Sequence, residues 1–247
     1  GPADMRLHRL RTVSYVPQGA MNSLNPVMTI ARQFRSALVD HDVRLGEREL
    51  ELRIRQALAG VELDRRVAGL YPHELSGGMK QRVCIAIGML LGPKLIIADE
   101  PTSALDVVTQ RQVMETLGRQ QRDAGSALIL IGHDMGLMAQ FVDRLAVMYA
   151  GRLGEIGGIR QGLEAPRPPY TRAPGAGGPR PAGRGELHGI AGVTPSLRRL
   201  PPGCAFHPRC AVAIERCRRD RPVLDGTIGG HRAACHLAEA PLAERAA

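Results

Sequence analysis

The chain has 247 residues and a formal net charge of +9, from 33 lysines and arginines against 24 acidic residues. This length allows one large domain with a buried core and a second, small domain. No apolar run approaches the roughly 18 residues of a membrane-spanning helix, and the first residues lack the apolar core of a signal peptide. We therefore expect a soluble chain whose contact with a membrane goes through a partner. The arginines are scattered and not interleaved with aromatic residues, so we expect no nucleic-acid partner.

Hydrophobic periodicity predicts alternating strands and helices over the first two thirds of the chain. In chain order we expect a strand at 12–18, amphipathic helices at 27–41 and 47–63, a helix at 79–91, buried strands at 94–100 and 126–133 on either side of a helix at 107–125, and a hairpin that turns at Ala150 and Gly151. The buried faces of the two amphipathic helices would carry Val27, Ile30, Phe34 and Leu38, then Leu50, Ile54, Leu58 and Val61. This order is typical of an α/β fold with a parallel-sheet core.

The composition changes in the last third of the chain. Residues 159–190 are rich in proline, glycine and arginine and predict an irregular linker. Beyond them, the small region 191–247 holds Cys204, Cys210, Cys217 and Cys235, with the spacing C-x₅-C-x₆-C-x₁₇-C. Four thiolates in a chain without a secretory signal suit Zn²⁺ or an iron–sulfur cluster. In a zinc site, His207, His231 or His236 could replace a thiolate.

Reactive side chains follow the predicted parallel strands. Asp99 and Glu100 end the strand "LIIADE", His133 ends the next buried strand, and Gln18 ends the first strand. Because open α/β sheets place ligands at the carboxyl ends of their strands, we expect these side chains at one site. Asp99 suits a Mg²⁺ ligand, and Glu100 suits a base that polarises an attacking water.

A second phosphate-binding feature opens the helix at "HELSGGMKQRV". The hydroxyl of Ser76, the amides of Gly77 and Gly78 and the positive helix end suit a phosphate group. The usual companion, a P-loop of the form G-x-x-x-x-G-K-[ST], is not found, because neither Lys80 nor Lys94 follows such a loop.

Five segments together resemble the ATP-binding cassette (ABC) ATPases. "YVPQ" with Gln18, "LSGGMKQR", "LIIADE", "SALD" and His133 follow the order and spacing of that family's Q-loop, signature, Walker B strand, D-loop and switch histidine. The resemblance covers residues 12–157. It implies that two cassettes dimerise head to tail, so that the signature of each faces the ATP held by the P-loop of the other. By this resemblance the residues that contact the partner's ATP are Ser76, Gly77, Gly78, Gln81, Ser103 and Asp106. It also gives Glu100 the role of general base, His133 that of γ-phosphate contact and Asp99 that of Mg²⁺ ligand.

The tail resembles the peptide-importer branch of this family, which takes up di- and oligopeptides and in some members nickel. "NSLNP" after Gln18, "PYT" at Pro169, "LPPGCAFHPRC" and "HRAACH" carry this resemblance. It implies a second ATPase subunit, two membrane permeases that contact the stretch 27–72, and an extracytoplasmic peptide-binding protein. It places the chain peripherally on the cytoplasmic face of the bacterial inner membrane. It also favours a [4Fe–4S] cluster over zinc in the tail.

A complete cassette carries a strand, the P-loop and an adenine-stacking aromatic before its Q-loop, and only 17 residues precede Gln18 here. We expect residues 1–158 to be a cassette truncated at its N-terminus, with a helical subdomain at about 22–92, followed by the linker 159–190 and the Cys-rich domain 191–247. Such a chain would not hydrolyse ATP alone. The alternatives are a non-catalytic regulatory fragment built around the metal tail and an ABC-type ATPase that acts on nucleic acid.

Overall fold

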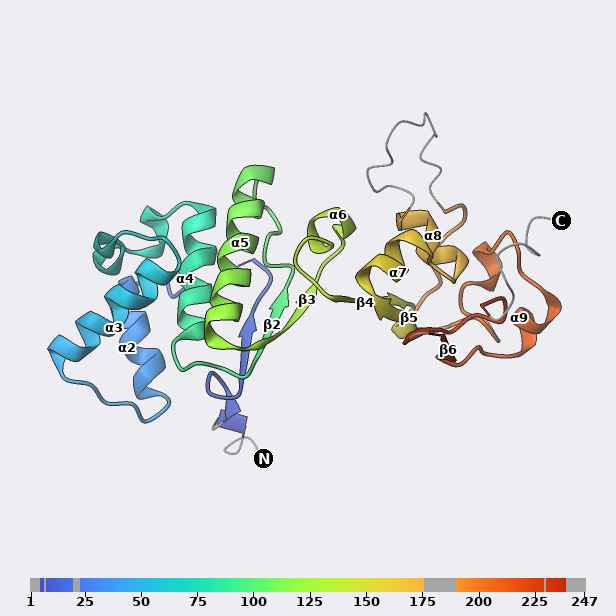
Figure 1. The fold of residues 1–247 in the computed structure, drawn as a ribbon. Coiled ribbons are helices and arrows are strands. Elements are labelled where there is room, and N and C mark those ends of the chain that lie inside the picture. The colour runs from blue at the N-terminus through green and yellow to red at the C-terminus, as the bar shows by residue number, and fades with distance from the viewer. Residues whose placement is uncertain (1–4, 7, 20–22, 176–189, 229, 239–247) are drawn as a thin grey trace. The chain divides into compact units, whose positions relative to one another are not determined.

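The computed structural model describes residues 5–6, 8–19, 23–175, 190–228 and 230–238, and it divides into two compact units (Figure 1). The first unit is Gly1–His133 and the second is Asp134–Ala247. No helix of the described residues is long and apolar enough to cross a membrane.

The first unit is built on a parallel sheet of three strands in the order β1-β2-β3. The strands are β1 (Val13–Val16), β2 (Leu95–Asp99) and β3 (Ala127–Ile131). Their register pairs Val16 with Ala98 and Asp99 with Ile131, so the three strands end together at one edge. This arrangement confirms the predicted α/β fold with a parallel-sheet core.

Two helices share a core with one face of this sheet. They are α4 (Gly77–Met89) and α5 (Val107–Ala124), which lie side by side in Figure 1. Alternate strand residues are buried in that core, including Val16, Ile96 and Ala98. The helix α5 ends at Gly125, whose φ of 62° lies in the left-handed region that glycine adopts without strain.

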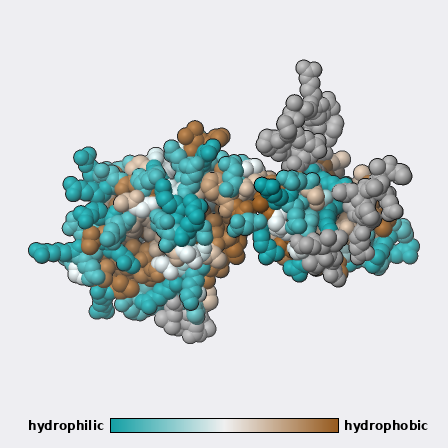
Figure 2. Space-filling model, in the orientation of Figure 1, coloured by the Kyte–Doolittle hydropathy of each residue, from teal (hydrophilic) through white to brown (hydrophobic). Residues whose placement is uncertain are grey.

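The third strand is less buried than its sequence predicts. Its residues alternate between half-buried and exposed, and Ile129 and Ile131 are 49% and 46% exposed. Figure 2 shows hydrophobic surface over this part of the first unit. An apolar run predicts burial on both faces, but within the described residues of this unit only one face of β3 packs into the core.

A helical subdomain connects β1 to β2. It comprises α2 (Ile30–Val39), α3 (Glu47–Gly60), the 3₁₀ turns η2 (Arg65–Gly69) and η3 (Pro72–Glu74), and α4. Every residue predicted on the two amphipathic faces is buried except one. Val27 is 76% exposed, because α2 begins at Ile30 after the N-cap Thr29 and Val27 precedes the helix.

The second unit contains the predicted hairpin. Strands β4 (Arg144–Tyr149) and β5 (Arg152–Gly158) are antiparallel and joined by Ala150 and Gly151, with φ values of 49° and 75°. Two consecutive positive φ values match the twist of a two-residue hairpin turn. The strand β5 pairs on its other side with β7 (His231–Ala233), which pairs with β6 (Asp225–Ile228). The tail therefore completes a four-stranded sheet on the hairpin.

Short helices occupy much of the remaining second unit. The range 159–190, predicted to be irregular, contains α7 (Ile159–Glu164) and α8 (Pro169–Gly175), while 176–189 lies outside the described residues. Pro169 opens α8, a position that tolerates proline because the first helical N–H needs no intrahelical partner. The other helical turns are α6 (Met135–Met138), η4 (His207–Arg209) and α9 (Glu215–Arg219).

Candidate functional site

The carboxyl ends of the three parallel strands bring four predicted residues together. Asp99 is the last residue of β2 and Glu100 follows it, while Gln18 and His133 each stand two residues beyond β1 and β3. Because the parallel strands end in register, the residues that follow them lie at the same edge of the sheet.

Glu100 is the centre of this group. The Nε2 of Gln18 donates a hydrogen bond of 2.6 Å to Glu100 Oε2, and His133 Nδ1 lies 3.2 Å from Glu100 Oε1. The Glu100 side chain is 28% exposed and that of His133 is 81% exposed. A carboxylate held between an amide and an imidazole, yet open to solvent, can accept a proton from a bound water.

The backbone of Glu100 is in an uncommon conformation. Its φ is 41°, in the left-handed region that costs a non-glycine residue about 1–3 kcal/mol. The Glu100 N–H donates to the carbonyl of Ile131 over 2.9 Å, which ties the end of β2 to the end of β3. At this turn the Glu100 carboxylate contacts His133.

Asp99 has a partner that the sequence did not single out. The hydroxyl of Tyr15 donates a hydrogen bond of 2.9 Å to Asp99 Oδ2, and this bond raises the pKa of Tyr15. The alternation of side chains along a strand could have indicated this contact. Tyr15 pairs with Ile97, and Asp99 stands two residues further along β2 on the same face. The strand β1 region thus supplies one donor to Asp99, from Tyr15, and one to Glu100, from Gln18.

The signature residues begin α4. Ser76 is its N-cap, and the Ser76 Oγ accepts a hydrogen bond of 3.3 Å from the N–H of Met79. Exposure falls along the segment, since Ser76 is exposed, Gly77 is half-buried and Gly78 is buried. Gln81, expected to contact ATP, is only 4% exposed, and its Nε2 has no hydrogen-bond partner among the described residues. Ser76 and Gly77 are therefore the accessible part of this segment.

The loop after Glu100 leads directly into α5. The N–H of half-buried Ser103 donates to the carbonyl of Glu100 over 3.1 Å. Asp106 is exposed and is the N-cap of α5, where Oδ1 accepts from the Thr109 N–H at 3.0 Å and Oδ2 from the Thr109 hydroxyl at 2.5 Å. These bonds, with the hydroxyl contributing most, hold the pKa of Asp106 below its usual value.

The four tail cysteines are free thiols within electrostatic reach of one another. Burial raises the pKa of Cys204, Cys210 and Cys235, and the other thiols of the group add to the increase. The N–H groups of Phe206, Val212 and Leu237, each two residues beyond one of these cysteines, lower it. The turns of the tail supply two amides to Cys204, from Phe206 and His207, and one each to Cys210 and Cys235.

The metal site expected at these cysteines is not confirmed. Among the described residues, no group of three or more His, Cys, Asp or Glu side chains is arranged to hold a metal ion. The three histidines considered as alternative ligands are each near another acceptor: His207 near the Cys204 carbonyl, His236 near the Asp220 carbonyl and His231 near Glu155.

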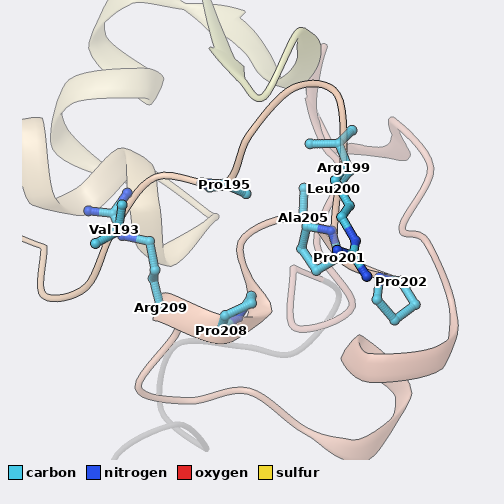
Figure 3. Close-up of a pocket in the computed structure, with 9 residues that line it drawn as sticks. All are labelled: Val193, Pro195, Arg199, Leu200, Pro201, Pro202, Ala205, Pro208 and Arg209. Carbon is cyan, nitrogen blue, oxygen red and sulfur yellow. The ribbon is translucent and has the colours of Figure 1, made fainter.

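A hollow of about 400 Å³ opens beside this tail (Figure 3). It is lined by Pro195, Pro201, Pro202 and Pro208 together with Val193, Leu200, Ala205, Arg199 and Arg209. The guanidinium of Arg209 donates to the carbonyls of Ile190 and Ala191 and so holds the neighbouring loop. The lining is apolar apart from the two arginines and does not define a ligand.

A parallel sheet whose strand ends carry adjacent acids, an amide and a histidine, together with a Ser-Gly-Gly helix start, is typical of nucleotide-binding α/β proteins. The family model "ABC transporter" matches residues 3–103, and "Oligopeptide/dipeptide transporter, C-terminal region" matches residues 155–217. The chain belongs to the ABC transporter family of ATP-binding proteins.

Curated relatives match almost the whole chain. A peptide import ATP-binding protein of Brucella melitensis is 40% identical over 239 residues, 94% of this chain and 71% of the relative. The dipeptide transport ATP-binding protein DppD of Caldanaerobacter subterraneus is 39% identical over 238 residues, 96% of this chain and 73% of the relative. The oligopeptide transport protein OppD of Mycobacterium tuberculosis is 40% identical over 241 residues, 95% of this chain and 39% of the relative.

Solved cassettes share the fold. The dimeric structure of the bacterial ABC transporter cassette MJ0796 is 27% identical with a TM-score of 0.57, covering 65% of this chain and 68% of that one. The same cassette, solved as a dimer in a post-hydrolysis state with ADP and Pi, is 28% identical with a TM-score of 0.53, covering 61% and 64%.

Proposed function

We propose that the chain is the ATP-hydrolysing subunit of a bacterial peptide-type ABC importer, which couples ATP-driven closure of an ATPase dimer to rearrangement of membrane permeases. The observation that supports it most directly is the contact of Gln18 and His133 with opposite oxygens of Glu100. The peptide and dipeptide transporters at 39–40% identity support the substrate class. None of the relatives named above supports the two alternatives, a regulatory fragment and a nucleic-acid ATPase.

In this proposal Glu100 takes the proton of the water that attacks the γ-phosphate. Both Glu100 oxygens have a partner in the structure, and each can still accept a further hydrogen bond from a water. The contact with His133 is the longer one, at 3.2 Å against 2.6 Å, and His133 is largely exposed. We infer that His133 turns from Glu100 to the phosphate while Gln18 keeps Glu100 oriented.

Asp99 suits a Mg²⁺ ion, which would neutralise the phosphate charge that develops in the reaction. Its Oδ2 is held by Tyr15, and its Oδ1 has no hydrogen-bond partner among the described residues. Asp99 is half-buried at the strand end, so that oxygen is available as a ligand. The role of Tyr15 is to fix the direction of the carboxylate.

We assign the Ser-Gly-Gly start of α4 to the ATP of a second ATPase subunit. Ser76 and Gly77 present a hydroxyl and helix-end amides at the surface. Gly78, Gln81, Ser103 and Asp106 support this segment, and the dimeric structures of MJ0796 are consistent with such an assembly. The sequence contains no P-loop motif, so we propose that these residues alone do not hydrolyse ATP.

A hollow of about 370 Å³ in the first unit suits the permease contact. It is lined from β1, from the segment after Gln18, from α2 and from α4 by side chains that include Leu24, Met28, Ala37 and Ile87. Because this segment follows Gln18, a permease helix seated there would be linked to Glu100 through the Gln18 hydrogen bond. In the full importer we expect two permeases and an extracytoplasmic peptide-binding protein, with this subunit on the cytoplasmic face of the membrane.

For the tail we propose that the four cysteines bind a [4Fe–4S] cluster, with Zn²⁺ as the alternative. The thiols are close enough to raise one another's pKa, and backbone amides near three of them would stabilise negative charge on sulfur. Both features fit a cluster held by thiolates. Anaerobic purification should give a brown protein with about four irons per chain, and Cys210→Ser but not Cys84→Ser should lose them. A colourless protein with one zinc would exclude the cluster and keep the site, and a metal-free protein would exclude both.

Peptide uptake tests the function itself. In an importer whose ATPase subunit joins these residues to a P-loop, Glu100→Gln should reduce ATP-dependent uptake of a labelled dipeptide by about 100-fold or more, because the general base is lost. The control Glu115→Gln changes a carboxylate on the solvent side of α5, 54% exposed, and should transport normally. Normal uptake by Glu100→Gln would refute the assignment of Glu100.

A further inference from the structure

The position of Gly78 leaves no room for a side chain, because a residue of α5 packs against it. It is buried in the first turn of α4, whereas Ser76 before it is exposed. A Cβ atom built on Gly78 would overlap the Thr109 methyl carbon Cγ2. Among the described residues outside the backbone of α4, the one other atom within 4 Å is Cβ of the same threonine, at 3.9 Å. The hydrogen of Gly78 thus leaves room for one specific side chain of α5.

Thr109 cannot move aside at little cost. Its hydroxyl donates to Asp106 Oδ2 over 2.5 Å and its N–H donates to Asp106 Oδ1 over 3.0 Å. A β-branched side chain has few χ1 rotamers, and the hydroxyl bond selects one of them. The methyl of Thr109 is therefore held against Gly78 by the same aspartate that caps α5.

A second contact joins the same two segments. A Cβ on Gly77 would lie 3.1 Å from Leu105 Cδ2, which is tighter than an ordinary van der Waals contact. The first turns of α4 and α5 are thus packed together at two consecutive glycines. Gly77 lies against Leu105, just before Asp106, and Gly78 lies against Thr109, three residues after it. The loop 103–106 cannot shift without moving the Ser-Gly-Gly turn.

We propose that Thr109 is a positioning residue for the ATP site, linking the loop 103–106 to the signature turn through Asp106 and Gly78. This inference rests on the proposed function, in which Ser76 and Gly77 contact the ATP of a partner subunit. In this proposal Thr109 acts through Asp106 and Gly78 and not by contact with the nucleotide. It sets the position of the turn that makes this contact, so that a displacement of Asp106 at the subunit interface reaches Ser76 within the same chain.

For the stability of α4 in the variant Gly78→Ala, the contact with Thr109 predicts the opposite of what helix propensity predicts. Alanine favours a helix interior over glycine, so Gly78→Ala would stabilise α4 if nothing opposed it. The overlap with Thr109 predicts destabilisation instead. The compensating change is Thr109→Ser, which removes the methyl and keeps the hydroxyl bond to Asp106.

The experiment measures ATP-driven association of the subunit with a partner ATPase subunit that carries a P-loop, in a hydrolysis-dead background. Gly78→Ala should weaken this association by about tenfold or more, and Gly78→Ala with Thr109→Ser should restore it to within about threefold. The matched control combines Gly78→Ala with Thr116→Ser, which removes a buried methyl elsewhere in α5 and should restore nothing. Failure of Thr109→Ser to restore association, or full association by Gly78→Ala alone, would overturn the inference.

Thr109→Val adds a readout that a purely structural role would not move. It keeps the packing shape and removes the hydrogen bond from the Thr109 hydroxyl to Asp106. The ATP-driven association with the partner subunit should therefore weaken several-fold, while the melting temperature of the subunit stays within about 3 °C of the unmodified value. Unchanged association would contradict the link. If the unmodified subunit does not associate with the partner subunit when ATP is present, the proposed function is wrong. The melting temperatures of the Gly78 and Thr109 variants then still decide whether the contact exists.

Discussion

His231 Nε2 lies 2.6 Å from Glu155 Oε1, and both side chains are buried, at 5% and 2% exposure. The two residues are 76 positions apart in sequence, one in β7 and the other in β5. Glu155 Oε1 also accepts the N–H of Arg167 over 2.8 Å. One buried carboxylate thus joins the hairpin, the segment before α8 and the C-terminal tail.

Removing this carboxylate should loosen the second unit. Glu155→Ala leaves a buried imidazole and a backbone N–H without their acceptor, which should lower the free energy of unfolding by about 3 kcal/mol. The exposed Glu164→Ala, in α7 of the same unit, is the matched control and should stay within about 0.5 kcal/mol of the parent. Chemical denaturation followed by circular dichroism measures both, and equal effects would contradict the role of Glu155.

Tyr15→Phe should weaken the binding of Mg²⁺ without unfolding the protein. The change removes the hydroxyl that directs Asp99 Oδ2. Losing an outer hydrogen bond to a metal ligand typically costs about tenfold in metal affinity. In the assembled importer, the Mg²⁺ concentration for half-maximal ATP hydrolysis should rise by about that factor, while Tyr71→Phe leaves it unchanged. An identical Mg²⁺ curve for Tyr15→Phe would show that Asp99 needs no support from β1.

Gly77→Asp should abolish ATP-driven association with the partner subunit. The new carboxylate would stand at the positive helix end where the phosphate is expected, and the two negative charges repel. Gly69→Asp introduces the same charge at an exposed glycine, where no atom of the described residues beyond its chain neighbours lies within 4 Å of the added Cβ, and should associate normally. Size-exclusion chromatography with ATP in a hydrolysis-dead background measures the difference. A dimer of undiminished affinity would refute the trans contact.

Cys84 should resist alkylation in the folded protein. Burial raises the pKa of its thiol to about 12, so at pH 8 only about one molecule in 10⁴ carries the reactive thiolate. Iodoacetamide at pH 8 should label Cys84 only after denaturation, as mass spectrometry of the peptides would show. Rapid labelling of the native protein at Cys84 would mean that α4 opens on the timescale of the reaction.

Local patterns in the sequence predicted the parts of the fold that depend on neighbours in the chain. The buried faces of α2 and α3 follow from helical periodicity, and the hairpin follows from the turn at Ala150 and Gly151. The convergence of Gln18, Glu100 and His133 followed from their places at parallel strand ends. The exposure of Val27 depends on where the helix cap falls, at Thr29, and periodicity alone does not fix that position.

Contacts between segments that are distant in sequence could not be predicted from local patterns. The Tyr15 bond to Asp99 requires the register between β1 and β2, and the overlap of Gly78 with Thr109 requires the packing of α4 on α5. The pairing of β5 with β7 spans a stretch of about eighty residues for which no periodicity gives the partner. Composition predicted an irregular linker over 159–190, but α7 contains no proline and α8 begins at Pro169, a first helical position that tolerates proline.

The pairing of β5 with β7 also limits how the protein can be shortened. A version that ends before residue 190 would lose β6 and β7, and β5 would then present a row of unpaired N–H and C=O groups along its free side. Exposed strand edges of this kind recruit other chains into intermolecular sheets. Removal of the tail should therefore produce aggregation rather than a smaller working ATPase, whatever the tail binds.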